Sequence, residues 1–154
     1  MRRDVQFVRA IEVPYAKVRD RLRGDPAVVL GDGTDPEGRI IAPLTATLRD
    51  RQVERDLLIE IVAFDEPAGD ALGSHLVLRG DASHHPGLFP KLDARFDAVP
   101  ISDERTALFF VGTYDPPLGA VGRAIDAVAL HRFAEESLRG LFERAGDRLE
   151  GSGE

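Results

Sequence analysis

Cysteine is absent from this chain of 154 residues. Its absence excludes disulfide bonds, thiolate nucleophiles and zinc sites ligated by cysteine. A chain without thiols is compatible with a reducing compartment, and we expect a cytoplasmic protein. Tryptophan is absent too, and lysine occurs only at Lys17 and Lys91, so arginine supplies nearly all of the positive charge.

Long apolar runs are also missing. No stretch approaches the roughly 20 consecutive apolar residues that a membrane-spanning helix needs. Met1-Arg2-Arg3-Asp4 is not followed by the apolar region of a secretory signal. The formal net charge of -7 would repel a phosphate backbone. We therefore expect neither membrane insertion nor nucleic-acid binding.

The composition that remains is that of a globular domain. Hydrophobic residues make up 43% of the chain and charged residues 31%, which is enough apolar material for a core without metal or disulfide support. We expect one domain over residues 1–150 and a flexible tail at 151–154.

Alternation of apolar and polar residues with a period of two predicts a series of strands. Pro43 favours an edge position or a bulge, because proline cannot donate to a sheet ladder. The last strand is apolar on both faces, which indicates a central strand covered on both sides or an oligomer contact, such as a homodimer, on its outer face. The expected strands span residues 4–13, 40–49, 53–64, 75–80, 92–99 and 106–114, with a short turn at Asp50-Arg51.

Helical periodicity appears in three places. A short helix is expected over residues 15–23, after Pro14, and Asp25-Pro26 starts a second short turn or helix that runs to Leu30. Residues 122–149 are expected to form one long helix of roughly 42 Å, whose apolar stripe advances in steps of three and four.

The order of these elements predicts the fold class. Strands joined by short turns pair antiparallel, and one face of their sheet stays bare unless the terminal helix lies across it. We therefore predict an α+β helix-grip fold, in which a curved antiparallel sheet wraps around the long C-terminal helix. A curved sheet and a straight helix differ in shape, and the gap between them is where a ligand could bind.

One junction carries a family resemblance. The stretch Tyr114-Asp-Pro-Pro-Leu-Gly-Ala-Val-Gly-Arg-Ala-Ile-Asp126, followed by His131-Arg132-Phe133-Ala134, resembles the last-strand-to-last-helix junction of bacterial START-like proteins. This is the SRPBCC superfamily, which includes polyketide cyclase/dehydrase-like and pollen-allergen-type proteins. The resemblance implies binding of a lipid, polyketide, hormone or other apolar molecule, and in some members cyclisation or dehydration. No catalytic motif of the family occurs here, so catalytic residues stay unassigned.

The predicted ligand site lies between the inner strand faces and the helix stripe. Small helix residues such as Ala134 would leave space unfilled there. The predicted ligand-binding residues are Leu44, Phe96, Leu108, Phe110, Tyr114, Leu130, His131, Ala134 and Leu138.

Polar groups near this site have two interpretations each. His131 lies four residues before Glu135, a spacing that either orients an imidazole or forms a surface pair, and we favour the surface pair. The Tyr114 hydroxyl either points into a cavity or binds a backbone carbonyl from the core, and we favour the carbonyl.

Other polar residues are interpreted as solvated. His84-His85 lies in a turn whose adjacent side chains seldom converge on one metal, so we expect no metal site and no cofactor. His75, Arg79 and Asp81 share one strand face, which we expect to be a charged outer surface.

Three functions remain. The first is binding of a small, largely apolar ligand in the cavity; the second is an enzyme of the cyclase or dehydrase type that uses His131, Tyr114 or a buried carboxylate. The third is a protein-interaction module with a filled core. A connected cavity favours the first two, and a packed core favours the third.

Overall fold

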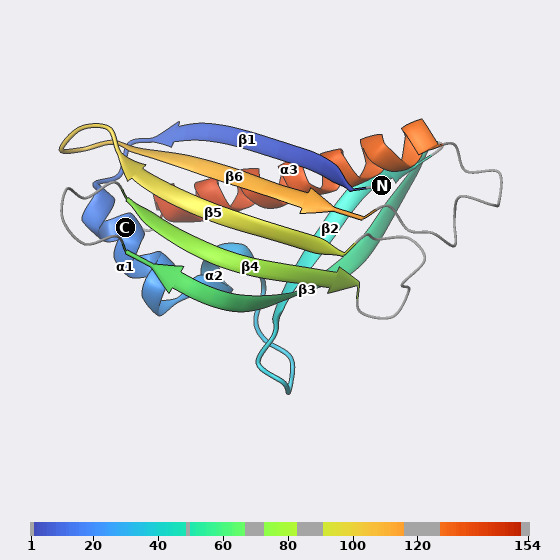
Figure 1. The fold of residues 1–154 in the computed structure, drawn as a ribbon, viewed down its shortest axis with the longest axis horizontal. Helices are drawn as coiled ribbons and strands as arrows, with labels where there is room; N and C mark the ends of the chain where they lie inside the picture. Colours follow the sequence, from blue (N-terminus) through green and yellow to red (C-terminus); the bar gives the residue numbers. More distant parts are fainter. Residues whose placement is uncertain (1, 49, 67–72, 83–90, 116–126, 152–154) are drawn as a thin grey trace.

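The computed structural model describes residues 2–48, 50–66, 73–82, 91–115 and 127–151. The helices are α1 (Tyr15–Gly24), α2 (Pro26–Leu30) and α3 (Ala127–Gly151). The strands are β1 (Arg3–Ile11), β2 (Ile40–Leu48), β3 (Arg51–Asp65), β4 (Ser74–Ala82), β5 (Leu92–Pro100) and β6 (Thr106–Tyr114). Figure 1 shows α3 running along one side of the curved sheet, with α1 and α2 at one end.

The described strands form one antiparallel sheet in the order β1-β6-β5-β4-β3-β2. From β2 to β6, each strand pairs with the next one along the chain. Strand β1 pairs with β6, so β1 and β2 are the two edge strands. Pro43 lies in β2 at one edge, so its predicted edge position is confirmed. A register shift between Ile61 and Ala63 bends β3, and such bulges increase sheet twist and curvature.

The predicted helix-grip architecture is confirmed. The inner sides of the strands pack against α3, and four phenylalanine rings meet at the centre of the core. Phe142 of α3 lies 5.9 Å from Phe7, 5.8 Å from Phe96 and 6.4 Å from Phe110, measured between ring centroids. Because these rings come from a helix and three strands, burying them joins the helix to the sheet.

Several boundaries differ from those predicted. β1 ends at Ile11 instead of Val13, β3 begins at Arg51 instead of Val53, and β4 is longer than residues 75–80. Asp50 alone of the predicted turn pair lies outside a strand, with a φ of 65°. Helix α3 continues to Gly151, two residues past its predicted end, whereas residues 122–126 of the predicted helix lie outside the described residues.

Strand β6 is central, as predicted, but it is not covered on both sides. Its inner residues, including Leu108 and Phe110, are buried. Its outer residues Phe109 and Val111 are half-buried and exposed, respectively. The apolar outer face of this strand is therefore a surface in the chain as described.

Arg9 attaches β1 to the C-terminal half of α3. It lies on the inner side of the strand, where the sequence shows a charge among apolar neighbours, and its side chain is only 21% exposed. Its guanidinium lies 3.0 Å from Glu143, 2.8 Å from Asp147 and 2.7 Å from Glu150. A Cβ on Gly146 would come within 2.8 Å of the Arg9 guanidinium, so glycine leaves room for the arginine side chain.

Replacing Arg9 with methionine is expected to destabilise the fold by about 1–2 kcal/mol, because three acidic side chains lose a shared counter-ion while the apolar stem is kept. The loss should be largest at low ionic strength and shrink in molar salt, since the carboxylates are partly exposed and screened. Urea unfolding at two salt concentrations measures it. Arg132→Met, at an exposed position of α3, is the control. Equal stabilities for the two variants would contradict a role for Arg9 in anchoring the helix.

Candidate functional site

The Tyr114 hydroxyl and the His131 imidazole form a polar contact inside the grip. Tyr114 is the last residue of β6, and His131 lies in the first described turns of α3. The hydroxyl is hydrogen-bonded to His131 Nδ1. The two rings are stacked, with centroids 6.0 Å apart and planes 16° from parallel. We predicted that the Tyr114 hydroxyl bonds a backbone carbonyl. That prediction is wrong, because the hydroxyl is bonded to the His131 side chain.

Glu135 continues this contact along the helix. His131 Nε2 lies 3.6 Å from a Glu135 carboxylate oxygen, at the predicted spacing of four residues. The pair is more than the expected surface pair, because the other ring nitrogen is bonded to a buried tyrosine. Arg139, one turn further, lies 3.6 Å from Glu135. Hydroxyl, imidazole, carboxylate and guanidinium thus form a continuous polar chain, which we call the Tyr114–His131–Glu135 chain.

Burial raises the pKa of the Tyr114 hydroxyl, because desolvation disfavours the phenolate. The positive charge of Arg3 acts in the opposite direction, and the negative charge of Glu135 adds to the rise. The hydroxyl therefore keeps its proton at neutral pH. A group in this state can act as both a hydrogen-bond donor and a hydrogen-bond acceptor.

The other predicted ligand-binding residues surround this chain and the phenylalanine cluster. All those with described side chains are buried, namely Leu44, Phe96, Leu108, Phe110, Ala134 and Leu138. The Leu130 side chain lies outside what the structure describes. The structure thus brings the predicted residues together in the buried core of the described part of the chain.

Hollows occur on the outside of the molecule. One, of about 600 Å³, lies over the outer face of the sheet and is lined in part by Val62, Val77 and Val111. Another, of about 670 Å³, lies beside the C-terminal part of α3, next to Arg21 and Arg148. Both are lined by residues other than the predicted ligand-binding set.

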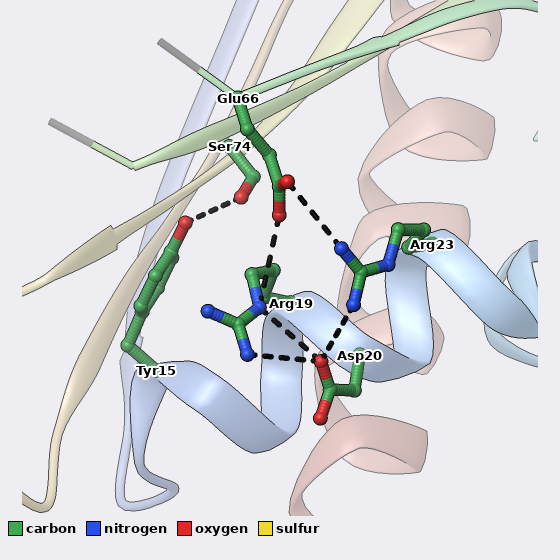
Figure 2. Close-up of polar contacts among 6 residues, drawn as sticks. All are labelled: Tyr15, Arg19, Asp20, Arg23, Glu66 and Ser74. Carbon is green, nitrogen blue, oxygen red and sulfur yellow. Dashed lines mark hydrogen bonds and ion pairs between the residues drawn. The ribbon is translucent and has the colours of Figure 1, made fainter. Parts of the chain in front are cut away.

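Helix α1 is attached to the sheet at one end of the grip. Figure 2 shows the Tyr15 hydroxyl pointing from α1 to the buried Ser74 at the start of β4, to which it is hydrogen-bonded. The Glu66 carboxylate lies 3.7 Å from Arg19 and 3.4 Å from Arg23 on the same helix. These contacts hold α1 against the ends of β3 and β4, and so close that end of the grip.

Helix α3 also has cross-links at this end. In addition to the Arg9 contacts, Arg148 donates a 2.8 Å hydrogen bond to the Gly31 carbonyl and lies 2.7 Å from Asp32. Arg144 donates to the Pro43 carbonyl on edge strand β2, and burial lowers the pKa of its guanidinium. Toward the other end of α3, the Thr47 amide donates a 3.4 Å bond to Glu136, and His131 contacts Tyr114.

The predicted charged outer face of β4 agrees with the structure. Arg79 and Asp81 are exposed, and His75 is half-buried on the same side. Arg79 lies 3.3 Å from Asp93 of the neighbouring strand. These residues therefore belong to the outer surface and not to the interior site.

Asp97 departs from the predicted pattern of apolar residues inside and charges outside. It lies on the outer side of β5 but is only 5% exposed. His75 Nδ1 lies 2.7 Å from one of its oxygens, and Arg95 Nε lies 2.9 Å from the other. A period-two pattern identifies the face of a residue, but it does not reveal burial by neighbouring side chains.

Metal ligation has no support in the described ranges, where no group of three or more histidine, aspartate or glutamate side chains is placed to hold an ion. The pair His84-His85 lies outside the described residues. No helix in the described part of the chain combines the length and the apolarity of a bilayer crossing.

No family model matches the chain, and no curated protein matches it significantly in sequence. Solved structures do resemble it. A conserved protein from Geobacillus kaustophilus is 16% identical, with a TM-score of 0.61 and coverage of 97% of each chain. A START superfamily protein from Mycobacterium smegmatis is 13% identical, with a TM-score of 0.51 over 97% of this chain and 95% of that one.

A third similar structure is the di-domain ARO/CYC protein BexL from the BE-7585A biosynthetic pathway. It is 11% identical, with a TM-score of 0.55, and the match covers 97% of this chain and 49% of BexL. At these identities the likeness concerns the fold. The chain has a START-like, or SRPBCC-like, helix-grip fold, as the junction at Tyr114 and the order of elements predicted.

Proposed function

We propose that this protein binds a small, largely apolar ligand, lipid-like or polyketide-like, between the sheet and the first turns of α3. The observation that carries the proposal is the Tyr114–His131 contact, a pair of hydrogen-bonding side chains at the edge of an apolar interior. Binding sites of this kind combine apolar walls with a few polar groups that orient the ligand. The similarity in fold to a START superfamily protein and to an ARO/CYC protein supports the same class of ligand.

The apolar residues around this contact supply the driving force for binding. Ala134 and Leu138 of α3 are buried, and so are Phe96, Leu108 and Phe110 of the sheet. The apolar area that a ligand buries against them, at about 25 cal/mol per Å², has to exceed the cost of association and of rearranging these side chains.

Replacing Ala134 with phenylalanine is expected to abolish binding. Ala134 is buried on the sheet-facing side of α3, one turn from His131, and a phenyl ring there occupies the space that a ligand would take. An apolar fluorescent probe should bind the wild-type protein with micromolar affinity and fail to bind the variant. The variant is expected to be less stable by about 1–3 kcal/mol, since a packed core resists added volume.

The matched control is Arg132→Phe, which adds the same ring at an exposed position of the same helix. It should bind the probe as the wild-type protein does. Circular dichroism at the assay temperature establishes that both variants are folded. If the wild-type protein binds no apolar probe, or if both variants bind equally well, the ligand-binding proposal is wrong.

Two other functions have support from particular observations. The Tyr114–His131–Glu135 chain is a hydroxyl–imidazole–carboxylate arrangement, which suits acid–base chemistry of the cyclase or dehydrase type. The packed interior and the exposed outer-face Val8 and Val111 favour an interaction module. Native mass spectrometry of the freshly purified protein separates the three: a retained small molecule supports binding, a chemically altered added molecule supports catalysis, and an empty monomer or a dimer supports the module.

A further inference from the structure

The hydrogen bond between Tyr114 and His131 can be made with either residue as the donor, and each arrangement presents a different polar group to a ligand. Resting on the proposed function, we propose that protonation of His131 reverses the Tyr114 hydroxyl: the site favours a ligand hydroxyl when His131 is neutral and a ligand carbonyl when it is protonated. The ligand class is therefore a largely apolar compound with one oxygen that reaches Tyr114.

The neutral arrangement follows from the contacts. Nδ1 of a neutral His131 accepts the Tyr114 proton, while Nε2 carries a hydrogen and faces Glu135 at 3.6 Å. Burial raises the pKa of Tyr114, so its hydroxyl remains protonated and donates its hydrogen bond to the imidazole. The phenol oxygen then has only lone pairs to offer. A ligand hydroxyl can donate to it, whereas a carbonyl finds no donor.

The protonated arrangement is the reverse. An imidazolium has a hydrogen on both nitrogens, so Nδ1 donates to the Tyr114 oxygen and Nε2 donates to Glu135. The Tyr114 proton is then free to turn toward the interior. A ligand carbonyl can accept it, and no covalent bond forms or breaks apart from the protonation of the imidazole.

The charged groups around the pair come from both layers of the fold. Glu135 on α3 lies 3.6 Å from His131 Nε2, and Arg139 lies 3.6 Å from the same carboxylate. On the sheet side, the positive charge of Arg3 from β1 acts on Tyr114. Nε2 therefore faces an acceptor, the Glu135 carboxylate, in both arrangements.

The experiment compares two fluorescent probes that share a ring system, 2-naphthol and 2-acetylnaphthalene. Their affinities are measured at about pH 8 and about pH 5, on either side of the ordinary imidazole value of about 6.5. In the wild-type protein the preference for the ketone over the naphthol should rise about fivefold or more as the pH falls, which is what one neutral hydrogen bond contributes. Tyr114→Phe and His131→Gln should each bind both probes with a preference independent of pH.

A second readout does not depend on the variants. By thermodynamic linkage, saturating ketone should raise the titration midpoint of His131 followed by NMR, and saturating naphthol should lower it. If both probes bind, and Ala134→Phe prevents their binding, but the preference and the midpoint do not change, this inference is wrong and the proposed function stands. If neither probe binds the wild-type protein, both are wrong.

Discussion

An aspartate in place of Leu141 is expected to leave the protein unfolded at room temperature. Leu141 is 2% exposed on the sheet-facing side of α3. The change removes a buried leucine, at a cost of about 2–5 kcal/mol, and introduces a carboxylate that has no partner in the apolar core. A domain of this size has a free energy of unfolding of about 5–15 kcal/mol, and we expect the two costs together to exceed that of this protein.

The control for this substitution is Val128→Asp, which introduces the same side chain on the same helix at a residue that is exposed. Its urea midpoint should stay close to that of the wild-type protein, whereas Leu141→Asp should give the circular dichroism spectrum of an unfolded chain. A Leu141→Asp protein that melts cooperatively near the wild-type temperature would show that α3 does not depend on packing against the sheet.

An alanine at Gly73 is the second change with a large expected effect. Gly73 has a φ of 106°, which residues with a side chain rarely adopt. A Cβ added at this position would lie 2.2 Å from the Ala98 carbonyl oxygen. That oxygen belongs to the backbone of β5 and cannot rotate away. We expect a loss of about 3–5 kcal/mol, from backbone strain and from the displacement of one strand against the other.

Gly38→Ala separates the two contributions. Gly38 also has a positive φ, 83°, but a Cβ there would meet nothing within 4 Å. It should lose about 1–2 kcal/mol from strain alone. Because Ser74 follows Gly73 and bonds Tyr15, the Gly73 variant should also loosen α1, seen as faster amide hydrogen exchange in that helix. Equal losses in the two variants would mean that the contact with Ala98 is relieved without cost.

Much of the architecture was predictable because periodicity reports directly on burial. The alternation in residues 92–99 identified the inner side of β5, and Pro43 indicated an edge position or a bulge, of which the structure shows the edge position. The apolar stripe of the last helix and the uncovered apolar face of the sheet each had to be buried, and each was the only large surface predicted to cover the other. These inferences use neighbours in sequence, where local geometry is nearly fixed.

The candidate site was predictable residue by residue but not as a unit. Tyr114 and His131 were each identified as polar groups near the interior, yet their contact crosses the junction between strand and helix. No spacing rule links residues across such a junction, because the path of the chain decides which ring nitrogen meets the hydroxyl. Arg9 was noticeable as a charge on an apolar face, but its partners lie more than 130 positions away.

The sequence by itself determined the class of fold, the strand faces and the helix that the sheet holds, because period and order of elements act locally or between adjacent elements. Only the tertiary structure decided that Asp97 is buried, that Arg9 of β1 contacts the C-terminal half of α3, and that Tyr114, His131 and Glu135 form one chain. Each of these depends on side chains from distant segments reaching one point, and their packing leaves no periodic trace in the sequence.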